Sequence, residues 1–83
     1  MTKSDIEKTM QAVATRFVRR IIGGHNINAE FISGMAAGLQ CSGFPELSDA
    51  LLDWETLQPV ALANCINRWA GEVVLNSDLT LAV

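Results

Sequence analysis

The chain has 83 residues, of which 49% are hydrophobic and 18% are charged, and its net charge is −3. This length predicts a single domain spanning residues 1–83, and no apolar run approaches the roughly 18 residues that a membrane-spanning helix needs. The first residues lack the apolar segment of a secretory signal, so we expect a cytoplasmic protein without membrane contact. Average globular proteins carry about 25% charged residues. The low charged fraction therefore predicts excess apolar surface, and with it a protein partner or a homo-oligomer, a dimer being favoured.

The first predicted helix covers residues 5–22 and has one continuous apolar side. Ser4 is its expected N-cap, and Glu7 three residues later completes a capping box. Gly23 and Gly24 end the helix, because glycine accepts the left-handed conformation of a C-cap. The apolar side is formed by residues at helical spacing: Ile6, Met10, Val13, Phe17 and Ile21, widened by Ala14, Val18 and Ile22.

The end of this helix carries a basic cluster of Arg16, Arg19 and Arg20. Residues 1–25 contain five cations and two carboxylates, whereas residues 26–83 contain one cation and seven carboxylates, so that charges of +3 and −6 make up the net −3. Oppositely charged parts attract each other within one fold or between subunits. The cluster is therefore expected to pair with carboxylates or to cap its own helix, and contact with nucleic acid is the alternative function that it allows.

The second predicted helix, residues 29–41, has almost no polar side. Asn28 suits its N-cap, and Glu30 is its only charged residue. Gly34 and Gly38 each lower helix stability by about 1 kcal/mol relative to alanine, so we expect a closely packed helix beside them as compensation. That neighbour belongs either to the same chain or to a second subunit. The segment is the predicted apolar interface, formed by Phe31, Gly34, Met35, Gly38 and Leu39.

Two further helices are predicted at residues 45–55 and 59–74, each with a proline in its first turn. Their apolar stripes are expected in the core: Leu47, Ala50, Leu51 and Trp54 in the first, and Leu62, Cys65, Ile66, Trp69 and Val73 in the second. Three carboxylates share the other face of the first of these helices, which is either solvated or a docking site for a basic partner: Glu46, Asp49 and Asp53. The chain shows no sustained period-two alternation, so four helices joined by short turns predict a compact all-α bundle.

The sequence contains no recognisable catalytic, metal or cofactor motif. His25 has no acidic or cysteine partner nearby in the sequence, and Cys41 and Cys65 lack the paired spacing of a metal site, so both thiols are expected in the core. We therefore predict a non-enzymatic protein without cofactor. Its predicted function is that of an inhibitor or adaptor that binds another protein, and also itself, through the apolar interface, the acidic face or both. The alternative is a nucleic-acid-binding regulator that uses Arg16, Arg19 and Arg20.

Overall fold

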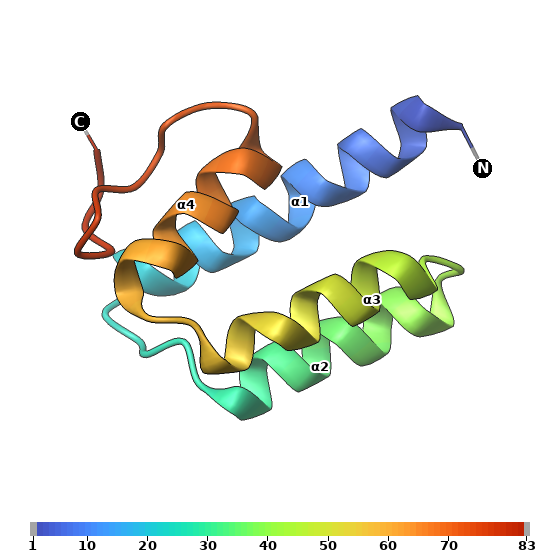
Figure 1. Cartoon of the computed structure of the whole chain (residues 1–83), viewed down its shortest axis with the longest axis horizontal. Helices are drawn as coiled ribbons and strands as arrows, with labels where there is room; N and C mark the ends of the chain where they lie inside the picture. Colours follow the sequence, from blue (N-terminus) through green and yellow to red (C-terminus); the bar gives the residue numbers. More distant parts are fainter. Residues whose placement is uncertain (1, 83) are drawn as a thin grey trace.

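The computed structural model describes residues 2–82, and within them the fold is all-α (Figure 1). The only pairing of extended backbone in this part of the chain is one isolated antiparallel bridge between Leu75 and Leu81. The helical elements follow in the order α1 (Lys3–Ile22), α2 (Ala29–Cys41), α3 (Pro45–Leu52), the short 3-10 helix η1 (Asp53–Thr56) and α4 (Pro59–Ala70). The predicted small helical bundle is therefore confirmed.

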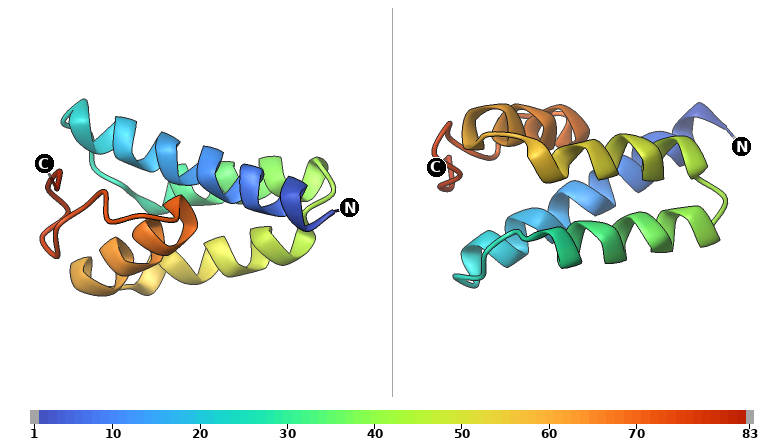
Figure 2. Two further views of the ribbon diagram at one scale, coloured as in Figure 1. Left: turned by 90° about the horizontal axis from the view of Figure 1, so that it is seen from above. Right: turned by 60° about the horizontal axis from the view of Figure 1, so that its bottom comes forward.

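The helices form two antiparallel pairs. α1 packs against α4, and α2 packs against α3, as Figure 1 shows. In Figure 2, α1 crosses over the α2–α3 pair and α4 runs along one side of it. The other side of α1 faces α2 across a groove that is described below.

Four aromatic side chains tie the two pairs together. The rings of Phe17 and Trp54 meet edge to face at 5.1 Å, and Trp54 lies 4.7 Å from Trp69. Phe31 meets Phe17 at 5.0 Å, also edge to face. Such pairs contribute about 0.5–1.5 kcal/mol each beyond the area that they bury. Both tryptophans are buried, which confirms their predicted place in the core.

The close contact between α2 and α3 passes through Ala36 and Ser48. The Ser48 hydroxyl donates a hydrogen bond of 2.8 Å to the Ala36 carbonyl oxygen, and both residues are buried. A small side chain on each helix is what lets the two backbones approach this closely. The prediction placed Ala50 on the buried face of this helix. That was wrong, because Ala50 is exposed and Ser48 takes the inward position.

Two helix ends differ from the predicted ones because of local hydrogen bonds. α1 begins at Lys3, since Thr2 rather than Ser4 is its N-cap. The backbone N–H of Asp5 donates to the Thr2 hydroxyl at 3.2 Å, and the Asp5 carboxylate accepts from the Thr2 N–H at 3.4 Å. The helix predicted at residues 45–55 ends at Leu52 and continues as the 3-10 turn η1.

α4 ends at Ala70, four residues before the predicted position, because Gly71 adopts the left-handed conformation with φ of 81°. The Asn67 side chain then holds the segment that follows. Its oxygen accepts from the N–H groups of Val74 and Leu75, both at 2.9 Å, and its amide donates to the Leu75 carbonyl at 3.0 Å. Leu75 is thereby buried against the core, whereas Val73, predicted on the apolar stripe, is 74% exposed.

Candidate functional site

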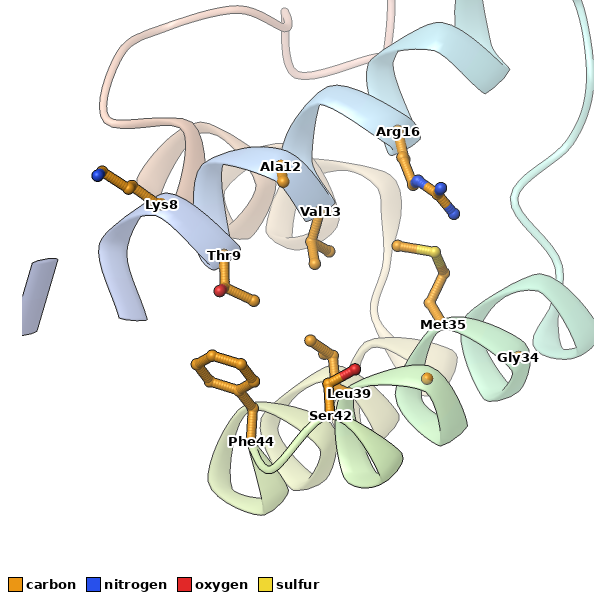
Figure 3. A pocket seen from close by; sticks show the side chains of 11 residues that line it. Lys8, Thr9, Ala12, Val13, Arg16, Gly34, Met35, Leu39, Ser42 and Phe44 are labelled. Atoms are coloured by element: carbon orange, nitrogen blue, oxygen red, sulfur yellow. The ribbon is translucent and has the colours of Figure 1, made fainter. Parts of the chain in front are cut away.

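A groove opens between α1 and α2 and has a volume of about 460 Å³ (Figure 3). Val13 and Leu39 form its floor; they are 5% and 6% exposed, and Figure 3 shows them pointing toward each other. The rest of its lining comes from both helices and the turn after α2: Lys8, Thr9, Ala12 and Arg16, and opposite them Gly34, Met35, Gly38, Ser42 and Phe44. We call this the α1–α2 groove. Apolar surface open to solvent in this form is typical of sites that bind a ligand or a partner.

Phe44 lies at one end of the groove. Its ring is half-buried, and it also borders a second cavity of about 250 Å³ beside Ile6 and Leu47. The apolar lining thus continues past Phe44 toward the N-terminal end of α1.

The α2 wall of the groove contains two glycines beside Met35 and Leu39. Gly34 and Gly38 are exposed, and a Cβ atom added to either would meet no heavy atom within 4 Å among residues 2–82. Of the two neighbours that the sequence left open for these glycines, a closely packed helix of the same chain is therefore absent from the described structure. The close neighbour of α2 is α3, which approaches through Ala36, and the glycines face open space.

The α1 wall is basic. Lys8 and Arg16 line the groove, and none of the described residues that line it is acidic. At about 100° of rotation per residue, Lys8, Arg16, Arg19 and Arg20 fall within about 120° of the helix circumference. The predicted arginine cluster is thus the end of a longer strip of cations that begins at Lys8, and of this strip Lys8 and Arg16 border the groove.

The three predicted arginines have different surroundings. Arg16 extends toward Met35 across the groove (Figure 3). Arg20 is held, since its Nε donates to the Asn26 carbonyl at 2.8 Å and its guanidinium carbon lies 4.4 Å from the centre of the Phe31 ring. Arg19 lines a separate surface hollow between α1 and the end of α4. Only Arg16 therefore belongs to the α1–α2 groove.

The residues of the predicted apolar interface also have different surroundings. Gly34, Met35 and Gly38 line the groove and are exposed or half-buried, whereas Leu39 is buried in its floor. Phe31 lies outside the groove, half-buried between Phe17 and the arginine above it.

The acidic face of α3 and η1 is exposed as predicted, with Glu46, Asp49 and Asp53 all at the surface. Glu55, in the same turn, accepts a hydrogen bond of 2.8 Å from the Ser33 hydroxyl and so links η1 to α2. Glu46 also borders the cavity of about 250 Å³ beside Ile6 and Leu47.

The remaining candidates do not form a site. His25 is exposed in the α1–α2 connection. Cys41 is also exposed, so the prediction that both thiols are buried was wrong for Cys41, while Cys65 is half-buried. Among residues 2–82, no three His, Cys, Asp or Glu side chains lie close enough together to hold a metal ion.

Sequence reasoning missed most of the α1 wall of the groove. Lys8, Ala12 and Arg16 recur at intervals of four, and Thr9 and Val13 form the adjacent row. This spacing alone would have placed them on one strip of α1. The sequence does not indicate which helix lies opposite that strip.

Comparison of the chain with protein-family models, with curated proteins and with solved structures gave no match. No helix within residues 2–82 is both long and apolar enough to cross a membrane.

Proposed function

We propose that this chain is a non-enzymatic protein-binding module, of the adaptor or inhibitor type, whose α1–α2 groove receives an amphipathic helix of another protein. The observation that carries the proposal is the position of Gly34 and Gly38. They lie at the rim of an apolar groove, face open space, and weaken their own helix by about 1 kcal/mol each. At these two positions the wall carries no side chain, so a second helix can approach the α2 backbone closely there.

The dimensions of the groove suit about two turns of helix. Its α1 wall runs from Lys8 to Arg16, and its α2 wall runs from Gly34 to Ser42. Each wall spans nine residues, whose eight steps of 1.5 Å add up to about 12 Å. A helix that docks in a groove anchors itself through side chains at positions i, i+3 or i+4, and i+7, which span about the same length.

A titration with a helical peptide tests this function. The probe is a 16-residue peptide with leucines at i, i+3 and i+7 and otherwise alanine and glutamine. We expect it to shift the backbone amide resonances of Val13, Met35 and Leu39 in a two-dimensional NMR spectrum more than those of α4. Shifts spread evenly over the molecule, or none at millimolar peptide, would exclude the groove as a helix site.

Two leucine substitutions on α2 form a matched pair for this titration. Gly38→Leu fills the groove, whereas Ala37→Leu puts the same side chain on an exposed position outside its lining. We expect only Gly38→Leu to abolish the shifts, while both variants remain folded by circular dichroism.

A homodimer through the same groove is the competing arrangement, because the low charged fraction also favours self-association. Light scattering on the eluting peak of a size-exclusion column separates the two. A dimer that Gly38→Leu converts to a monomer would make a second copy the occupant, whereas a monomer supports a different protein.

Nucleic-acid binding is the second candidate, and the cation strip on α1 favours it. Phosphate contacts would give an affinity for generic duplex DNA that falls steeply with salt. Absence of binding at 20 mM salt would end this alternative.

A further inference from the structure

The two walls of the α1–α2 groove differ in charge. Lys8 and Arg16 stand on the α1 wall, and the residues on the α2 side, Gly34, Met35, Gly38 and Ser42, are uncharged. We propose that the partner is a helix with an acidic flank: apolar along the side that enters the groove, carboxylates along the flank that meets α1, and small neutral residues along the flank that meets α2. This inference rests on the proposed function and specifies the partner.

The spacing of the two cations sets the spacing of the partner's carboxylates. Lys8 and Arg16 are eight residues apart on α1, which corresponds to about 12 Å along the helix. A partner helix lying along the groove places carboxylates at the same separation when they are seven or eight residues apart. The apolar anchors between them lie over Val13 and Leu39.

The two cations determine selectivity more than affinity. Lys8 and Arg16 are exposed, and charge pairs at a solvated rim chiefly raise the association rate and exclude partners of like charge. The apolar floor supplies the binding that all helical partners share. Exchange of the partner's flank from acidic to basic is therefore expected to change the affinity by about tenfold at low salt.

The chain's own acidic helix, α3, does not combine an acidic flank with an exposed row of apolar residues. α3 presents Glu46 and Asp49 to solvent, but Leu51 is buried and Leu47 is half-buried in the same molecule. The remaining leucine of α3, Leu52, is 42% exposed, so a second copy would offer carboxylates beside one exposed leucine and not the row of apolar anchors that the groove floor requires. The acidic helix is accordingly assigned to a different protein.

Nucleic acid also fits the groove less well than a helix does. The cations that line it, Lys8 and Arg16, share the groove with a floor of buried valine and leucine side chains. Contact with apolar side chains does not stabilise bound phosphate groups, whereas the apolar side of a helix is stabilised when it is buried against them.

Three peptides test the inference. They share the three leucines at i, i+3 and i+7 and carry glutamate, glutamine or lysine at the flanking positions that are seven residues apart. Fluorescence anisotropy at 50 mM salt gives their dissociation constants for the full chain. We expect the glutamate peptide to bind about tenfold more tightly than the lysine peptide, with the glutamine peptide between them, and this difference to shrink at 500 mM salt.

Charge reversals on the protein locate the effect. In the Lys8→Glu/Arg16→Glu double variant the preference is expected to reverse in favour of the lysine peptide. The control is Lys3→Glu/Arg68→Glu, which makes the same change of net charge at exposed cations outside the groove lining. The control is expected to keep the preference for the glutamate peptide.

The outcomes separate this inference from the proposed function. Equal binding of all three peptides, still abolished by Gly38→Leu, would overturn the acidic partner and leave the helix-binding groove intact. Binding of none of the peptides would overturn both. Duplex DNA binding that Lys8→Glu/Arg16→Glu removes, or dimers that it dissociates, would overturn the acidic helix in favour of nucleic acid or of a second copy.

Discussion

Replacement of Gly34 and Gly38 by alanine should make this protein more stable. Both glycines lie inside α2, neither has a positive φ, and a Cβ atom at either position enters open space within the described structure. Alanine is favoured over glycine inside a helix by about 1 kcal/mol per residue. Nothing in the surroundings offsets this gain, so the double variant is expected to gain about 1–2 kcal/mol. For a domain of this size, that corresponds to a rise in melting temperature of about 4–16 °C.

Thermal and urea unfolding followed by circular dichroism at 222 nm measure this gain. Gly71→Ala is the control, because Gly71 has φ of 81° and an alanine there is strained; it should lower the melting temperature. Unchanged or reduced stability of the Gly34→Ala/Gly38→Ala variant would refute the reasoning, since it would mean that another part of the chain packs against these glycines. Binding of the leucine peptide to the more stable variant should be weaker, because the groove is narrower.

Three further predictions concern the interior and the segment after α4. Asn67→Ala removes three hydrogen bonds to the backbone of Val74 and Leu75, so it should lower the free energy of unfolding by about 2–4 kcal/mol in urea titrations. The control is Asn64→Ala at an exposed position, which should change this free energy by less than about 0.5 kcal/mol. Ser48→Ala removes the hydroxyl that bonds to α2 and should lower the same quantity by about 1 kcal/mol; a gain in stability would contradict the role assigned to this bond. Hydrogen bonds from the Thr80 hydroxyl and N–H lower the pKa of Asp78 from its ordinary value of 3.8. The ionised Asp78 carboxylate therefore stabilises the fold above that value, and this stabilisation is lost as the pH falls below it and through the folded-state pKa. The urea midpoint should fall more between pH 5 and pH 3 in the natural chain than in Asp78→Asn.

The helices and the core could be predicted from the sequence because their signals are local. Apolar residues at helical spacing located α1 and α4, and glycine and proline marked the turns between elements. Trp54 and Trp69 were expected in the core on the same grounds, and both are there. Each of these inferences needs only the residues of one helix.

The end of α4 could not be predicted from helical spacing. Trp69 and Val73 are four residues apart, which favours a continuous helix, but Gly71 between them turns to a left-handed conformation. What stabilises that turn is the Asn67 side chain, which binds backbone groups seven and eight residues later. Sequence periodicity placed Asn67 on the polar side of the helix and gave no indication of these bonds.

The groove could not be predicted because it depends on which helices pair. The sequence identified α2 as a helix that needs neighbours, and its small residues suggested a close one. In the structure Ala36 provides that close approach to α3, while Gly34 and Gly38, two positions away on either side, are left open. A rotation of α2 by about 160° would exchange their roles, and the composition of the helix alone does not determine that rotation.

The pairing of α1 with α4 has a consequence for how the chain folds as it is synthesised. The α2–α3 hairpin is joined by a turn of three residues and can form as soon as both helices exist. α1 must wait for α4, and at 5–20 residues per second the interval between Phe17 and Trp69 lasts roughly 3–10 s. During that time the part of the apolar side of α1 that packs on α4 stays exposed, although Phe17 can already meet Phe31 and Trp54. Docking of α1 on α4 is therefore expected to be the late step of folding, and chaperones have several seconds in which to bind α1.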